Sequence, residues 1–162
     1  MNNNDILRRL RFAINLSDAS MVSTFALGGY ETDENGVRNL MAREEEPEMV
    51  VCDGDILGAF LDGFIITKRG PRDPSAPVPE PSELNNNQIL KKLRIALNFR
   101  EASMLAILAK GGHVMSKHEL TALFRKPSHK HFREAGGQVV RRFLYGLTAE
   151  LRPGDVDAAE QP

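Results

Sequence analysis

The sequence has a single cysteine, no tryptophan and no long hydrophobic run. One thiol, Cys52, cannot form an internal disulfide, and no cysteine spacing matches a zinc site, which favours a reducing compartment. The longest apolar runs are a few residues, far short of the ~20 needed to cross a bilayer. The N-terminal segment lacks the basic start and apolar core of a signal peptide. We therefore expect a cytoplasmic protein.

Recognisable catalytic and cofactor motifs are also absent. The glycine pairs Gly28-Gly29 and Gly111-Gly112 do not belong to a GxxxxGK[ST] phosphate loop. The histidines have no carboxylate or thiol nearby at a metal-ligand spacing. A small buried cysteine is the commoner interpretation of Cys52, although a Cys–His nucleophile stays an alternative. The sequence predicts no catalytic residue, no metal site and no cofactor, and it favours a protein that is not an enzyme.

What the sequence does contain is a duplication. The phrase NNNDILRRLRFAIN at residues 2–15 returns as NNNQILKKLRIALN at residues 85–98. A shift of 83 positions aligns residues 2–65 with residues 85–148 without a gap. Aligned glycines and apolar residues over such a length indicate two copies of one module. Identical pairs include Met21/Met104, Gly28/Gly111, Gly29/Gly112, Leu40/Leu123, Phe60/Phe143, Leu61/Leu144 and Gly63/Gly146.

Each copy has the pattern of four short helices. In the first helix, Ile6, Leu7 and Leu10 share one face at helical spacing. Asn4 and Asn87 are expected to be N-caps, because an amide side chain can accept a bond from a free helical N–H. The first helix is expected near 5–15 and 88–98, and the second near 18–27 and 101–110. The third is expected to begin near Asp33 and near Lys117, where Ser116 is the cap. The fourth is expected to begin near Asp53 and near Gly137, with Phe64–Thr67 as a frayed end.

We therefore predict an all-α protein made of two tandem homologous four-helix repeats, packed with pseudo-two-fold symmetry. A module of this size is marginal alone, and a second copy with the same apolar face can cover it. The expected organisation is an acidic first repeat at 1–69, a Pro-rich linker at 70–83, a basic second repeat at 84–148 and a flexible acidic tail at 149–162. The linker has five prolines, which stiffen it toward polyproline II.

The doubled NNNxIL(R/K)(R/K)LR phrase and the segment from Phe124 to Glu134 resemble the YehS-like bacterial family of two-copy domains of unknown function. The resemblance spans nearly the whole chain apart from linker and tail, and it implies no activity. In that family a Cys-Gly-Asp-Gln segment follows the Arg-Glu pair, whereas this chain has Ala135-Gly136-Gly137-Gln138. The difference argues against a redox or nucleophilic role for position 135.

The two copies differ most in charge. Residues 1–69 carry 7 basic and 12 acidic side chains, a net charge of −5. Residues 84–148 carry 12 basic and 3 acidic side chains, a net charge of +9. All four histidines lie in the second copy: His113, His118, His129 and His131. Clustered cations of this kind neutralise phosphates, so the second copy is a candidate anion-binding or nucleic-acid-binding surface.

The residues predicted to form that surface are Lys117, Arg125, Lys126, His129, Lys130, His131, Arg133, Arg141 and Arg142. Phe124, Phe132 and Tyr145 lie between them and are candidates for stacking on bases. The alternative is that Phe124, Phe132 and Phe143 are core residues, because they align with the apolar residues Met41, Met49 and Phe60. A helix-turn-helix around Gly111-Gly112 is a weaker alternative, since the first copy carries acidic residues in the same layout.

Two function hypotheses follow. In the first, the protein is a non-enzymatic cytoplasmic binding or adaptor module, and its second repeat contacts an anionic macromolecule or an acidic protein surface. In the second, it is a homo-oligomeric protein–protein interaction protein, for example a homodimer, in which the acidic repeat docks on the basic repeat. Neither involves a membrane.

Overall fold

The computed structural model describes residues 1–77 and 83–154. Within these ranges every regular element is an α-helix and no strand is present, so the prediction of an all-α fold is confirmed. No helix in the described residues has the length and hydropathy to cross a membrane. The helices are α1 (Asn3–Ile14), α2 (Asp18–Leu27), α3 (Glu34–Met41), α4 (Gly54–Arg69), α5 (Asn86–Leu97), α6 (Glu101–Lys110), α7 (Lys117–Phe124) and α8 (Gly137–Leu151).

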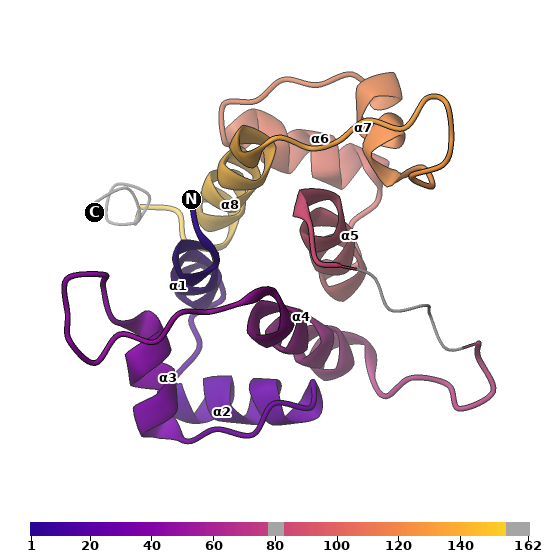
Figure 1. Cartoon of the computed structure of the whole chain (residues 1–162). Helices are drawn as coiled ribbons and strands as arrows, with labels where there is room; N and C mark the ends of the chain where they lie inside the picture. Colours follow the sequence, from indigo (N-terminus) through magenta and orange to yellow (C-terminus); the bar gives the residue numbers. More distant parts are fainter. Residues whose placement is uncertain (78–82, 155–162) are drawn as a thin grey trace.

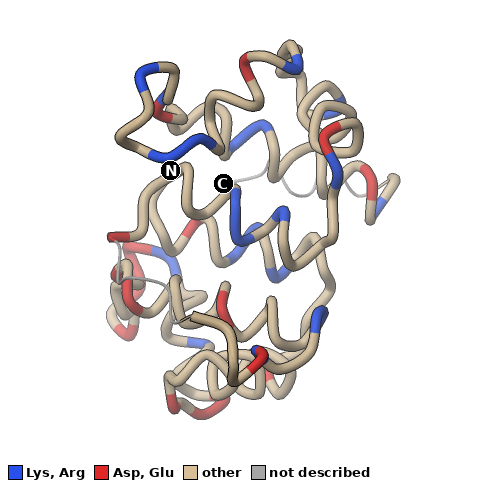
Figure 2. Tube along the Cα trace, turned by 90° about the vertical axis from the view of Figure 1, so that its right-hand side faces the viewer, with Lys and Arg blue, Asp and Glu red and all other residues tan. Residues whose placement is uncertain are grey.

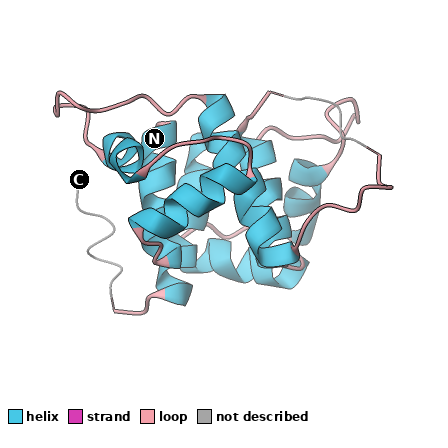
Figure 3. Cartoon of the chain, turned by 90° about the horizontal axis from the view of Figure 1, so that it is seen from below, coloured by secondary structure: helices cyan, strands magenta, loops and turns pink. Residues whose placement is uncertain are grey.

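The first four helices form the first repeat and the last four form the second. Helices α1, α4, α5 and α8 make a central bundle, with α2 and α3 on one side and α6 and α7 on the other (Figure 1). The main contacts in the bundle run between repeats: α4 packs along α5, and α1 packs along α8. Helix α1 corresponds to α5, and α4 corresponds to α8. Exchanging the repeats therefore turns the α4/α5 contact into the α8/α1 contact, which is the expected pseudo-two-fold relation. Figure 3 shows the same helices from below, with the loops at the periphery.

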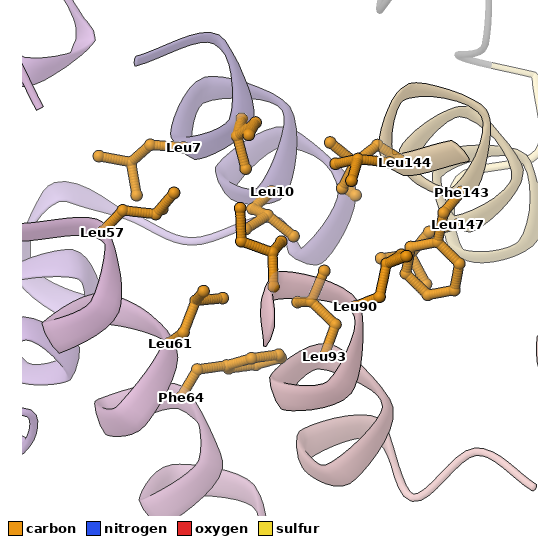
Figure 4. Close-up of a cluster of buried hydrophobic side chains, with 14 of the residues drawn as sticks. Leu7, Leu10, Leu57, Leu61, Phe64, Leu90, Leu93, Phe143, Leu144 and Leu147 are labelled. Atoms are coloured by element: carbon orange, nitrogen blue, oxygen red, sulfur yellow. The ribbon is translucent and has the colours of Figure 1, made fainter. Parts of the chain in front are cut away.

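A single apolar core crosses the seam between the repeats. Leucines of α1 and α4 meet leucines of α5 and α8, and all of them are at most 1% exposed (Figure 4). Burying a leucine side chain is worth about 1.5–3 kcal/mol, so the seam is a main source of stability. The leucines labelled in the close-up are Leu7, Leu10, Leu57, Leu61, Leu90, Leu93, Leu144 and Leu147.

Glycines set the close approach of the outer helices to the bundle. A Cβ added at Gly63 of α4 would lie 1.8 Å from the carbonyl oxygen of Thr24 in α2. In the second repeat, a Cβ at Gly146 of α8 would lie 1.8 Å from the carbonyl oxygen of Ile107 in α6. The aligned pair Gly63/Gly146 is therefore required by helix–helix contact in both repeats.

The N-caps of α1 and α5 lie two residues earlier than predicted. Asn2 and Asn85, not Asn4 and Asn87, cap α1 and α5, because their side chains accept hydrogen bonds from the backbone N–H of Asp5 and Gln88. Ser116 caps α7 as expected, with Glu119 completing a capping box.

Asn4 and Asn87 have a different role inside the protein. The Asn4 side chain is buried and donates to the carbonyls of Leu40 (3.0 Å) and Val50 (2.9 Å), while its oxygen accepts from the Cys52 N–H (2.9 Å). In the second repeat, Asn87 makes the same three bonds, with Leu123, Arg133 and Ala135. Each asparagine therefore fastens the loop before the fourth helix to the first helix.

Two helix ends differ from the sequence expectation. Phe64–Thr67 belongs to the regular part of α4, which continues to Arg69, so the prediction of a frayed end there was wrong. Helix α8 continues to Leu151, so the first three residues of the range assigned to the tail are helical. Residues 78–82 of the expected linker and residues 155–162 of the expected tail lie outside the described residues.

Candidate anion-binding surface

The loop between α7 and α8 carries six of the nine residues predicted for the surface. Its turn is closed by hydrogen bonds from the His129 N–H to the Lys126 carbonyl (2.8 Å) and from the Phe132 N–H to the His129 carbonyl (3.0 Å). Because Asn87 also holds the end of this loop, the loop has a defined conformation. We call residues 125–133 the basic loop; the six are Arg125, Lys126, His129, Lys130, His131 and Arg133.

A small pocket of about 120 Å³ lies between the basic loop and the N-terminus of α5. Three cations line it, Lys91, Arg125 and Lys126. The Nε atom of Arg125 is buried and has no hydrogen-bond partner within the described chain. The first turn of α5 has no acidic residue, so the positive end of the helix dipole adds to the charge. The other lining residues are Asn85, Asn87, Gln88, Leu123, Phe124, Pro127 and Phe132.

At the equivalent place in the first repeat, the chain supplies two carboxylates of its own. Asp5, which aligns with Gln88, accepts from the Asn2 backbone N–H at 3.0 Å and pairs with Arg8 at 2.5 Å. Glu44, which aligns with Pro127, accepts from the Asn2 side chain at 2.9 Å. The second repeat lacks both acids, so its helix N-terminus and cations have no internal anion there.

The electrostatics of Asp5 agree with this comparison. Partial burial of its carboxyl acts to raise the pKa of Asp5, but the Asn2 N–H and the Arg8 guanidinium outweigh burial and lower that pKa below its ordinary value. The first repeat therefore favours a negative charge at the N-terminus of α1.

The nine basic residues predicted for the surface have no carboxylate partner in the part of the chain that the structure describes. In the first repeat, by contrast, Arg8, Arg11 and Arg38 all have a carboxylate partner. Figure 2 shows the imbalance, with acidic residues mainly in the lower half of the molecule and basic residues mainly in the upper half.

The structure does not bring all nine residues together. Lys117 lies in the first turn of α7, at the opposite end of that helix from Arg125. Arg141 and Arg142 lie on α8 beside Tyr145, and Figure 1 shows α8 on the far side of α6 from the turn of the basic loop. The predicted surface is therefore divided into the basic loop, an isolated lysine and an arginine pair on α8.

The aromatic residues between these cations have mixed environments. Tyr145 is 7% exposed and is surrounded by guanidinium groups, so it is not available for stacking on a base. Phe124 is half-buried against the core, with the Arg94 guanidinium 4.9 Å from its ring centroid. Phe132 is also half-buried, in the wall of the pocket. The core interpretation therefore holds for Phe143, which is fully buried, and in part for Phe124 and Phe132.

Two histidines lie together in the basic loop, and Cys52 is buried in the first repeat. The rings of His129 and His131 are 5.6 Å apart, and Arg125 approaches His129 at 3.5 Å. No cluster of three metal-ligating side chains is found among the described residues. Burial, together with the nearby Asp53, raises the pKa of Cys52 to about 12, so this buried thiol is protonated at neutral pH and is a poor nucleophile.

Lys91 and Gln88 belong to the pocket but were missed by the sequence prediction. The signal was present in the repeat alignment, which pairs Asp5 with Gln88 and Glu44 with Pro127. A count of charges over whole segments detects the cations that the second repeat has gained. It does not detect the loss of an acidic residue at a single aligned position.

Two comparisons with known proteins give the same assignment. The family described as "Protein of unknown function (DUF1456)" matches twice, at residues 3–70 and 86–153. The chain is 41% identical over 150 residues to "Uncharacterized protein YehS" of Escherichia coli (strain K12), which covers 92% of this chain and 96% of that protein. No solved structure matches. The chain is therefore a member of the DUF1456 family, with two copies of the family's domain.

Proposed function

We propose that the protein is a non-enzymatic cytoplasmic binding module whose second repeat contacts an anionic partner, with nucleic acid as the first partner to test. The basic loop and the pocket at the N-terminus of α5 form the main contact. Lys117, Arg141 and Arg142 lie apart from that contact and are not needed for it.

One observation carries the proposal: the acids Asp5 and Glu44 that complete the first repeat are missing from the second. Two copies of one backbone thus differ in whether the chain supplies an anion at a helix N-terminus. Helix N-termini and arginine side chains bind phosphate oxygens well. An external phosphate in the second repeat would take the role that the carboxylates have in the first.

Binding of this kind depends steeply on salt. If Lys91, Arg125, Lys126, Lys130 and Arg133 each neutralise one phosphate of duplex DNA, the slope of log K against log salt is about −4.5. Raising NaCl from 50 to 200 mM would then weaken binding by a few hundred-fold. Fluorescence anisotropy with labelled single-stranded and double-stranded oligonucleotides measures this slope.

The test variant is Gln88→Asp, which introduces the acid of the first repeat into the second. It completes a capping box with Asn85, so the free energy of unfolding should rise slightly. Nucleic-acid affinity should nevertheless fall by about tenfold, because the carboxylate competes for the pocket. Loss of binding together with gained stability excludes misfolding as the cause.

Asn35→Asp is the matched control, because it adds the same charge to the exposed first turn of α3 in the other repeat. It should leave binding nearly unchanged. The proposal fails if the wild-type protein shows no affinity for either oligonucleotide at 50 mM salt, or if Gln88→Asp binds as well as the wild type.

A further inference from the structure

The bundle has two pseudo-equivalent outer edges, one between α1 and α8 and the other between α4 and α5. At the α1/α8 edge, three guanidinium groups surround the Tyr145 ring: Arg9 at 4.6 Å, Arg141 at 5.4 Å and Arg142 at 5.9 Å from its centroid. The Arg141 Nε also donates to the tyrosine hydroxyl at 3.1 Å. We call these three arginines and Tyr145 the arginine edge.

The α4/α5 edge is hollow and acidic. A cavity of about 630 Å³ opens there, and its wall includes Asp53, Asp55, Asp62 and Glu83. Lys92 is the cation in this wall and pairs with Asp62 at 2.5 Å, which leaves the lining three negative charges in excess. We call this cavity the acidic groove.

The two edges are opposite in shape because of substitutions at aligned positions. Arg141 and Arg142 align with Gly58 and Ala59, which line the groove, and Tyr145 aligns with Asp62. A Cβ added at Gly58 would meet nothing within 4 Å, so this part of the groove is open. The same backbone therefore carries long cationic side chains at one edge and an open, anionic hollow at the other.

We propose that the arginine edge of one copy docks in the acidic groove of a second copy. Arg141 and Arg142 provide positive charge at the edge, and the groove lining has a net charge of three negative, so the two surfaces are complementary in charge. The proposal uses residues outside the basic loop and goes beyond the proposed function.

The geometry also determines the kind of assembly. The edges lie on opposite sides of the central bundle, with α1 and α8 on one side and α4 and α5 on the other (Figure 1). A contact between two different surfaces is heterologous, so it joins copies head to tail and leaves one edge and one groove free at the ends. We expect small oligomers that grow with concentration rather than a closed dimer.

Sedimentation velocity of the full chain over a range of concentrations tests this. At 50 mM NaCl the weight-average mass should rise with concentration, and at 500 mM NaCl the protein should be monomeric, because salt screens exposed charge pairs. A protein that stays monomeric at millimolar concentration and low salt overturns the proposal.

Two neutralised variants identify the surfaces. The edge variant carries Arg141→Gln and Arg142→Gln, and the groove variant carries Asp55→Asn and Glu83→Gln, which leaves the α4 N-cap Asp53 and the Asp62–Lys92 pair intact. Each variant alone should associate at least about tenfold more weakly than the wild type. Mixed in equal amounts, they should form a species of two chains and no larger one, since one intact edge and one intact groove remain.

The control variant, Arg125→Gln with Lys126→Gln, removes two charges from the basic loop instead. It should assemble like the wild type while losing nucleic-acid affinity, so the failure of one proposal does not imply the failure of the other. The docking proposal is overturned if the edge and groove variants each assemble as the wild type does. It is also overturned if a mixture of the two variants stays monomeric. Circular dichroism checks that every variant is folded.

Discussion

At the scale of single residues, the repeated asparagine triplet shows how one residue type serves several purposes. The first asparagine caps a helix, and the third is buried, with one hydrogen bond to α3 and two to the loop that precedes the fourth helix. The sequence predicts that the triplet begins a helix, but not which member is the cap. That choice depends on where the loop returns, and the loop residues that bond Asn4 lie 46 and 48 positions further along the chain.

We predict that Asn4→Ala destabilises the protein by about 3 kcal/mol, because it leaves two carbonyls and one N–H without their partner. Urea unfolding followed by circular dichroism measures the change. Asn3→Ala, at the neighbouring half-buried position, is the control and should cost less than about 0.5 kcal/mol. Equal effects at the two positions would contradict a fastening role for Asn4.

At the scale of helices, periodicity predicts the elements well. All eight expected helices are present, because apolar residues recur at helical spacing and glycines follow α2 and α6. The contacts between helices are harder to predict. Gly28 and Gly111 end α2 and α6, and their second role in close helix packing can be seen only from the positions of α4 and α8.

Two glycines of α4 should respond oppositely to alanine. Gly63→Ala places a Cβ against the Thr24 carbonyl and should destabilise the protein by about 1–3 kcal/mol. Gly58→Ala meets nothing and should stabilise it by up to about 1 kcal/mol, because alanine favours the helix. Thermal and urea unfolding of the two variants give the signs. A stable Gly63→Ala protein would contradict the close approach of α2 and α4.

At the scale of the whole molecule, the repeats are not independent units. The largest helix contacts of the bundle cross from one repeat to the other, and one ion pair among the described residues, Lys92–Asp62, joins the repeats across an apolar seam. Sequence reasoning predicts a shared core, because one copy is small. It does not predict which helices meet, so the arginine edge and the acidic groove were not predicted, and Arg141 and Arg142 were grouped with a loop that lies elsewhere.

We therefore predict a single unfolding transition for both repeats. Leu93→Ala, in the second-repeat half of the seam, should lower the free energy of unfolding by about 3 kcal/mol. Native-state hydrogen exchange should show that amides of α4 in the first repeat lose protection together with those of α5. Loss of protection confined to the second repeat would indicate that the halves unfold separately.

The pairing of α1 with α8 and of α4 with α5 has an evolutionary consequence. Two identical unfused ancestors with this packing would form a symmetric pair, and any mutation would then appear on both edges at once. Joining the genes removes that constraint, because each edge is encoded separately. Arginines could accumulate on one edge and aspartates on the other without altering the leucine seam that both inherit.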